Sequence, residues 1–418
     1  MSLANPDPRA DDAGANRGAH GRTRETEGLR ALGVYVHFPW CLKKCPYCDF
    51  WSIPAQRQEL PHAEYADAVL SELELRSERL GPRRLESVFF GGGTPSLWQP
   101  RELGRVLARI LSRFDPAPQV EITVECNPSS FDRDCARALL DVGINRVSIG
   151  VQGLDAARLE FLGRLHDPDG GLRAVEDALA AGVPRVSADL IFGVHGQSAT
   201  SAAHEAATVA ALGVEHLSAY ALTIEPGTEF GKRARQGTLP LAEDDAVAES
   251  FLAVDEALGP LGFDHYEISN YARAGARSRH NVGYWLGREY LGLGVSAWGT
   301  LMLDGTRVRY RNTLSTDRYL DADWPAIDLS RAHSLVPERE IIDAETALRE
   351  RILLGLRLEE GLDLSAAALE LGVEAWTTDR LRAVQRLEGR ARLERAGDVL
   401  KIPKSAWLFA DGTIASLL

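Results

Sequence analysis

Short β-rich runs alternate with helical patterns between residues 33 and 222, and this alternation restricts the fold more than any other feature of the sequence. Strand–helix–strand alternation is typical of a parallel sheet covered by helices, and six such units predict an α/β fold with an open, barrel-like (β/α)6 sheet. The β-rich runs are Gly33–Phe38, Glu86–Phe90, Val120–Glu125, Asn145–Gly150, Val186–Phe192 and His216–Leu222. Helical patterns between them include His62–Leu80, Glu102–Phe114, Asp132–Val142 and Thr200–Leu212.

Polar or glycine-rich segments follow several of these strands. In parallel sheets, binding and catalytic groups collect at the carboxyl ends of the strands. We therefore expect these segments to converge on one edge of the barrel. They are the cysteine loop after the first strand, Gly91-Gly92-Gly93-Thr94-Pro95 after the second, Glu125-Cys126-Asn127-Pro128 after the third, Gln152 after the fourth, and Asp189 in the fifth.

Three of the five cysteines form a CxxxCxxC motif at Cys41, Cys45 and Cys48. An odd number of closely spaced cysteines is a poor disulfide framework and a good metal site. Thiolates bind both zinc and iron–sulfur clusters, but a structural zinc site is usually closed by four ligands and no fourth ligand lies at a suitable spacing. The motif favours a cluster with one open iron. Cys126 and Cys135 are expected to be buried thiols.

Composition restricts the partners and the location. The 418 residues contain 47 Lys and Arg against 60 Asp and Glu, a net charge of −13, which disfavours a nucleic-acid partner. No stretch approaches the roughly 18 apolar residues of a membrane helix, and the N-terminus lacks the apolar segment of a secretory signal. We expect a cytoplasmic protein, with at most a loose peripheral membrane contact.

Four segments are predicted along the chain. Residues 1–30 have almost no large apolar side chains and are expected to be a disordered tail, and residues 31–235 hold the barrel. Residues 236–330 contain a helix followed by aromatic and glycine-rich loops. Residues 331–418 are expected to form a small module of helices and a hairpin, similar to a winged helix, with a helical segment at Glu338–Leu356.

The order of these motifs resembles the radical S-adenosylmethionine (SAM) superfamily. The similarity covers roughly residues 33–325 and consists of CxxxCxxC, GGGTPS and ECNP after successive strands. Within the superfamily, VYVHFPWCxxxCPYC, SIGVQ, GRLHD and SADLIFGVHGQ resemble the oxygen-independent coproporphyrinogen oxidase group. The resemblance implies a partial barrel of the radical SAM type, a 4Fe-4S cluster and bound SAM.

The resemblance also implies roles for individual residues. Cys41, Cys45 and Cys48 would hold the cluster. The residues implied to contact SAM are Tyr35, Tyr47, Gly92, Gly93, Thr94, Glu125, Gln152, Arg164 and Asp189. Their chemistry suits that role, because backbone approaches a ligand closely at glycine, and a guanidinium grips a carboxylate as a fork. Alone, each could equally be a tight turn or a solvated surface group.

Two features separate the branches of this group. The oxidases carry a further cysteine two positions after the last cluster cysteine, where this chain has Phe50. His280-Asn281-Val282-Gly283-Tyr284-Trp285 resembles the HNxxYW signature of HemW-type haem chaperones, which marks residues 236–330 as a haem-chaperone region. The resemblance implies a chaperone that takes haem as cargo and passes it to respiratory proteins. The alternatives are a coproporphyrinogen oxidase and a radical enzyme acting on an unrelated substrate.

The candidate haem residues are His280, Tyr284 and Trp285, because a haem site needs an iron ligand beside flat aromatic surface. His265 is a second candidate ligand. The alternative for His280 is a hydrogen-bonded structural histidine. Related chains usually read GLGAGAHG where this chain reads GLGVSAWG, so Trp298 stands at the position of their histidine. If that histidine binds haem in the related chains, this chain lacks the ligand. No residue pattern identifies the electron donor.

Overall fold

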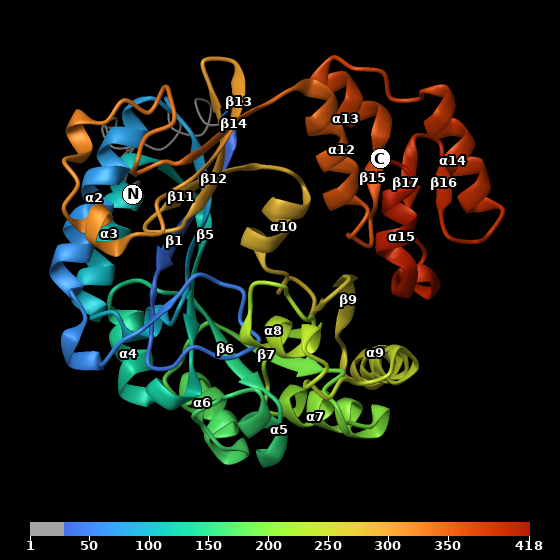
Figure 1. Cartoon of the computed structure of the whole chain (residues 1–418), viewed down its shortest axis with the longest axis horizontal. Coiled ribbons are helices and arrows are strands. Elements are labelled where there is room, and N and C mark those ends of the chain that lie inside the picture. Colours follow the sequence, from blue (N-terminus) through green and yellow to red (C-terminus); the bar gives the residue numbers. More distant parts are fainter. Residues whose placement is uncertain (1–28) are drawn as a thin grey trace, which may run out of the picture.

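A mixed sheet of 12 strands forms the centre of the computed structural model, which describes residues 29–418. All but the last two residues of the predicted tail 1–30 lie outside the described residues. Six parallel strands follow one another in the sheet, confirming the predicted parallel α/β fold, and the barrel is open (Figure 1). They are β1 (Ala31–Phe38), β4 (Arg84–Gly92), β5 (Asp115–Cys126), β6 (Arg146–Gln152), β7 (Arg185–Phe192) and β8 (His216–Ala221).

Helices cover the outer face of these strands (Figure 1). Many of them begin at a side chain that accepts a hydrogen bond from the backbone N–H three residues later, as Asp132, Asp155, Asp167 and Ser198 do. Such caps satisfy N–H groups that have no partner within the helix and fix where the helix starts. The helices of this part of the chain are α2 (His62–Glu78), α3 (Pro100–Arg113), α4 (Arg133–Asp141), α5 (Ala156–Phe161), α6 (Pro168–Ala180), α7 (Ala199–Ala211), α8 (Glu229–Arg235) and α9 (Asp244–Leu258). Of these, α8 packs against the cysteine loop, where the Phe230 N–H donates to the Pro46 carbonyl at 2.9 Å.

The sheet extends beyond the predicted strands on both sides. Strand β11 (Glu289–Leu293) is parallel to β1 on its free edge, and three antiparallel strands continue from it: β12 (Trp298–Leu303), β13 (Thr306–Arg311) and β14 (Glu338–Ile342). On the other side, β10 (Asn270–Ala272) and β9 (Asp264–Glu267) follow β8.

Two sequence-based expectations are wrong here. The aromatic and glycine-rich segments predicted as loops contain β9, β10 and a short helix over Arg279–Trp285. The last of these segments, residues 290–299, holds most of β11 and the start of β12. Its glycines are needed because a Cβ at Gly292 would overlap the Trp298 carbonyl, and one at Gly299 would overlap the Tyr310 ring. The helix predicted over Glu338–Leu356 begins only at Ala344, since its first five residues form β14. Strand pairing therefore continues past the predicted boundary at residue 330.

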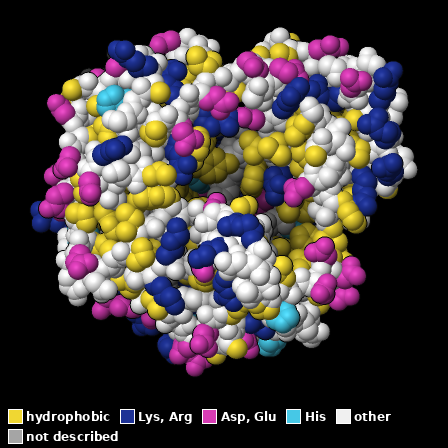
Figure 2. Space-filling model, viewed as in Figure 1, with side chains coloured by type: hydrophobic (Ala, Val, Ile, Leu, Met, Phe, Trp, Pro, Cys, Tyr) yellow, Lys and Arg dark blue, Asp and Glu magenta, His cyan; other side chains and the backbone are white. Residues whose placement is uncertain are grey.

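The C-terminal residues form a unit with its own apolar core around Leu348, Ile352, Leu400 and Trp407. Figure 2 shows a hollow between this unit and the barrel, over α10 (Arg279–Trp285), with hydrophobic side chains on its walls. The unit combines α12 (Ala344–Gly355), α13 (Leu364–Leu371), α14 (Thr378–Glu388) and α15 (Ala410–Ala415) with a sheet of β15 (Leu362–Asp363), β17 (Val399–Lys401) and β16 (Glu394–Ala396).

Three further short elements lie outside this unit: β2 (Trp40–Cys41), β3 (Ile53–Pro54) and α11 (Thr316–Leu320). Within residues 29–418, no helix has the length and apolar character needed to span a membrane.

Candidate functional site

Two cavities meet at the carboxyl edge of the parallel strands. The first, which we call the cysteine cavity, encloses ≈ 520 Å³ and is lined by all three motif cysteines. The second, the inner cavity, encloses ≈ 430 Å³ inside the barrel, and its lining combines aromatic side chains with polar and charged ones. Phe50, Glu125, Asp189 and Tyr220 line both. Volumes of this size suit small-molecule ligands, so the fold provides two adjoining ligand sites.

The cysteine loop leaves β2 and presents its three thiols to the cysteine cavity. The Thr94 hydroxyl donates to Cys41 Sγ at 3.5 Å, and Arg164 Nη1 donates to Cys45 Sγ at 3.6 Å. Burial raises the pKa of Cys41 and raises that of Cys48 to about 11, so without a bound cation these thiols are protonated near neutral pH. Donors aimed at sulfur are suited to stabilising thiolates once a metal group supplies the positive charge.

The spacing of the thiols bears on what the loop can bind. In the described part of the chain, no three His, Cys, Asp or Glu side chains group as the ligands of a single metal ion would. Three thiols line the cysteine cavity, whereas a structural zinc ion usually has four ligands, so the loop suits a cluster in which one iron has no protein ligand.

The glycine turn after β4 packs tightly against the strand that leads into the cysteine loop. Gly92 has φ of 108°, and a Cβ there would lie 2.6 Å from the His37 ring. A Cβ on Gly93 would lie 2.5 Å from the Trp40 carbonyl oxygen, which already accepts the Thr94 N–H at 2.8 Å. Glycine is therefore required here for contact within the protein, in addition to any contact with a ligand.

Glu125 and Asp189 form the wall between the two cavities. Glu125 Oε2 accepts the Gly92 N–H at 3.1 Å, and Asp189 accepts the Ser148 hydroxyl at 3.1 Å. Burial and the neighbouring Asp189 carboxylate raise the pKa of Glu125 to about 8, and burial raises the pKa of Asp189. Carboxylates that share a cavity and lack a full set of donors are suited to accepting hydroxyl groups from a ligand.

The pKa of Glu125 gives a prediction for the protein without bound cofactors. In the folded state this carboxyl stays protonated up to about pH 8. In the unfolded chain it ionises at about pH 4.3. Between these values the folded state binds more protons, so the group lowers stability as pH rises. The Glu125→Gln variant has no ionisable group at this position. Its free energy of unfolding is therefore expected to exceed that of wild type, by an amount that grows as the pH rises from about 5 to about 8. Urea unfolding at several pH values measures the margin, and a pH-independent difference would contradict the assignment.

Gln152 and Arg164 border the cysteine cavity beside β6. Gln152 has φ of 66°, which is uncommon for a residue with a side chain, and it follows an irregularity in the pairing of β6 with β7. Arg164 Nη2 donates to the Gly150 carbonyl at 2.7 Å, and its buried Nε has no hydrogen-bond partner among the described residues. Arg164 thus bridges β6 and the cysteine loop.

The two candidate tyrosines lie in different cavities. Tyr47 lines the cysteine cavity, with its ring 6.4 Å from that of Phe230. Tyr35 lines the inner cavity, and its hydroxyl lies 3.0 Å from His37 Nδ1. Tyr35 is therefore placed beside the second ligand site, away from the cysteines.

His280 is held on all sides by protein groups and is 4% exposed. Its Nδ1 lies 2.9 Å from the Ser87 hydroxyl, its Nε2 lies 3.0 Å from the Tyr284 hydroxyl, and its ring stacks on Phe89 at 4.9 Å. Burial lowers its pKa to about 3, so the ring is neutral. This arrangement is that of a hydrogen-bonded structural histidine, and an iron atom would have to displace one of the two bonds.

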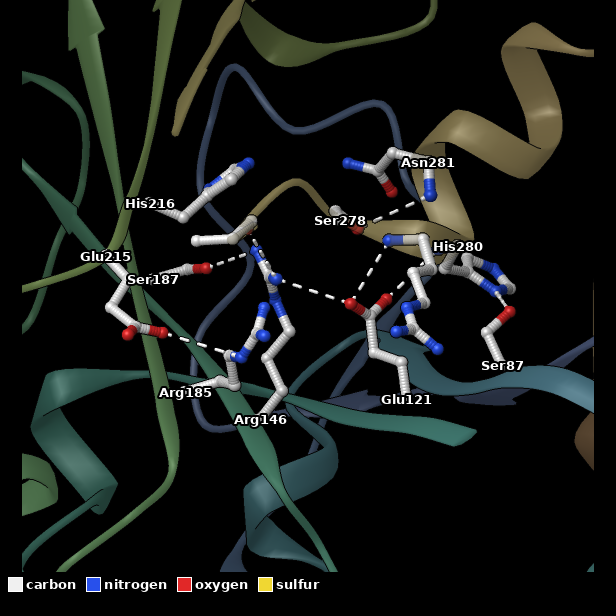
Figure 3. A network of polar contacts seen from close by, with 12 residues as sticks. Ser87, Glu121, Arg146, Arg185, Ser187, Glu215, His216, Ser278, His280 and Asn281 are labelled. Atoms are coloured by element: carbon white, nitrogen blue, oxygen red, sulfur yellow. Dashed lines mark hydrogen bonds and ion pairs between the residues drawn. The ribbon is translucent and has the colours of Figure 1, made fainter. Parts of the chain in front are cut away.

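Strand residues that the sequence analysis did not single out hold α10 in place. Figure 3 shows Glu121 between the Arg146 guanidinium and the start of α10. Glu121 accepts the backbone N–H of His280 at 3.0 Å and pairs with Arg146 at 3.3 Å. Arg146 also donates to Ser187 at 2.7 Å. Glu121 stands in the middle of β5 and Arg146 is the first residue of β6, and alternation along each strand is the signal that could have placed them inside the barrel.

Of the other haem candidates, Tyr284 shares the inner cavity with His280, whereas Trp285 and His265 do not. Tyr284 lines the inner cavity, whereas Trp285 lies outside it with the Arg357 guanidinium 5.3 Å over its ring. His265 lies away from both cavities, with Nδ1 2.9 Å from Asp255 and Nε2 3.1 Å from the Ile268 carbonyl.

Comparison with known proteins places the chain among radical SAM proteins. The pattern of the radical SAM superfamily matches residues 35–204, and that of the HemN C-terminal domain matches residues 342–409. The haem chaperone HemW of Mycobacterium tuberculosis is 34% identical over 390 residues, which cover 93% of this chain and 95% of the relative. HemW of Escherichia coli is 36% identical over 70% of this chain and 78% of the relative.

A solved structure agrees at the level of the fold. Coproporphyrinogen III oxidase (HemN) of Escherichia coli, a radical SAM enzyme, superposes with a TM-score of 0.77 over 96% of this chain and 93% of that chain. The two sequences are 20% identical, so the similarity shows the fold alone. The activity has to be inferred from the residues of the site.

Proposed function

Because the chain belongs to the HemW family of radical SAM proteins, we propose that it is a haem chaperone. It holds a 4Fe-4S cluster and SAM, takes haem as cargo and delivers it to respiratory proteins from the cytoplasm. The observation that carries this proposal is the pair of adjoining cavities, one lined by three thiols and the other lined in part by aromatic rings.

The cysteine cavity fits the cluster and the cofactor together. Cys41, Cys45 and Cys48 would hold three irons, and the Thr94 and Arg164 donors would stabilise two of the thiolates. The polar groups around the rest of the cavity would hold SAM: Gly92, Gly93, Thr94, Glu125, Gln152, Arg164 and Asp189, with Tyr47 beside them. When bound and reduced, the cluster supplies one-electron chemistry to the cofactor.

Phe50 favours the chaperone over the oxidase. It occupies the position of the further cysteine of the oxidases, is 62% exposed and lines both cavities. A flat apolar ring there can pack against a tetrapyrrole but cannot serve as a thiol in chemistry on propionate side chains.

An anaerobic haem titration of the cluster-reconstituted protein tests the proposal. We expect roughly stoichiometric binding with a shift of the Soret band. In parallel, coproporphyrinogen is incubated with the protein, SAM and a reductant. Absence of haem binding, or formation of protoporphyrinogen, would overturn the chaperone assignment, and protoporphyrinogen would identify the oxidase.

A further inference from the structure

The lining of the inner cavity includes an aromatic ring paired with a guanidinium, those of Trp298 and Arg311. Resting on the proposed function, we propose that Trp298 and Arg311 form the binding surface for the cargo's macrocycle. The ring stacks on Trp298 and a carboxylate of the cargo pairs with Arg311. The ligand class is a planar conjugated macrocycle that bears carboxylates, held without iron ligation by His280.

The pairing of β12 and β13 places these two side chains together. Trp298 and Arg311 are directly opposed in the register, and cross-strand partners project from the same face of the sheet. The Arg311 guanidinium lies 5.3 Å from the centre of the Trp298 ring, and both side chains line the inner cavity. The pair is thus fixed by strand geometry at the cavity mouth.

Arg311 keeps donors available for a ligand. Its Nη1 donates to Glu338 at 3.2 Å and its Nη2 donates to the Ser296 hydroxyl at 3.3 Å. A guanidinium has five N–H groups, so these contacts orient it and leave donors free. Burial, with a smaller contribution from the charge of Arg311, lowers the pKa of His37, which lines the same cavity. A carboxylate is the group that a guanidinium in this position binds best.

Exposed aromatic rings surround the same mouth. Trp298 is 37% exposed, and Tyr220 is 41% exposed beside the even more open Phe50. Large apolar side chains gathered at a cavity mouth indicate a binding surface. Flat rings offer stacking to a conjugated macrocycle, which matches the cargo of the proposed function in shape as well as in charge.

Of the three histidines that line the inner cavity, His280 and His37 offer no free nitrogen, whereas the buried Nδ1 of His216 has no hydrogen-bond partner among the described residues. Both ring nitrogens of His280 are hydrogen-bonded, and so are those of His37, to Tyr35 and to the Trp51 carbonyl at 2.9 Å. A macrocycle bound at Trp298 and Arg311 would therefore gain no iron ligand from His280 or His37.

The test compares haem with iron-free protoporphyrin IX on the cluster-reconstituted full chain, using quenching of tryptophan fluorescence and the Soret band. We expect the iron-free porphyrin to bind within about 10-fold of haem, and Trp298→Leu to weaken both ligands about 10-fold, as loss of a stacking contact does. Trp298→Phe keeps a flat ring and should retain affinity within about 3-fold. Arg311→Gln should weaken protoporphyrin IX about 10-fold and leave its dimethyl ester unchanged.

A matched control lies in the C-terminal unit, where the Arg392 guanidinium is 3.2 Å from the centre of the half-exposed Phe409 ring. Phe409→Leu should leave every affinity unchanged, and iron content should be equal in all variants. Unaltered affinity in Trp298→Leu and Arg311→Gln, or binding of haem without binding of the iron-free porphyrin, would overturn this inference while the proposed function stands. Failure of the wild-type chain to bind either ligand would overturn the proposed function and this inference with it.

Discussion

Replacement of Cys45 by serine is expected to remove the iron–sulfur cluster and SAM binding together. A cluster held by three thiolates cannot be retained securely by two, and SAM would lose the open iron that anchors it. Loss of a group in the surroundings of a metal site already costs 10–100-fold in affinity, so we expect SAM affinity to fall by more than about 100-fold. Iron and acid-labile sulfide analysis after anaerobic reconstitution, with equilibrium dialysis of SAM, measures both effects.

Cys135→Ser is the matched control. This thiol is half-buried outside the cysteine cavity, with its Sγ 3.9 Å from the Ser96 carbonyl oxygen. It should reconstitute like wild type. Full iron content in Cys45→Ser would refute the ligand assignment, and equal losses in both variants would mean that the defect lies in folding rather than in the cavity.

The six parallel strands could be predicted because each one buries both faces and therefore reads as a short apolar run. The predicted Val186–Phe192 and the observed β7 differ by a single residue. The strands that were missed obey other constraints. β11 contains Gly292, which is required where the backbone of β12 passes closely, and such glycines remove the apolar signal. β14 carries Glu338 and Glu340, because it is an edge strand with one partner.

The same reasoning explains which site residues could be placed together. Glu125 and Asp189 lie near the carboxyl ends of neighbouring parts of the sheet, and the structure brings them to one wall as that rule predicts. Trp285 could not be grouped with His280 from a contiguous motif. On a helix, residues four apart share a face and residues five apart do not, so Tyr284 reaches His280 while Trp285 points elsewhere.

The loop that leads into Trp298 depends on a buried charge network. Glu72 in α2 is fully buried and accepts hydrogen bonds from Arg76 at 2.6 Å, Tyr319 at 2.6 Å and the Gly294 N–H at 2.9 Å. The Gly294 bond ties the connection between β11 and β12 to the core of the barrel. The network therefore supports both the stability of the fold and the position of Trp298.

Arg76→Met is expected to cost about 3–5 kcal/mol of unfolding free energy, because it leaves the Glu72 carboxylate buried without its cation. The urea midpoint measures the loss. Adding Glu72→Gln removes the uncompensated charge, so the double variant should regain part of the stability, which a simple loss of packing would not allow. The exposed pair of Arg109 in α3 with Glu74 in α2 is the control, and Arg109→Met should change the midpoint little. If the double variant were no more stable than Arg76→Met, the aliphatic part of Arg76 and its stacking 3.8 Å over the Tyr310 ring would account for the stabilisation instead of its charge.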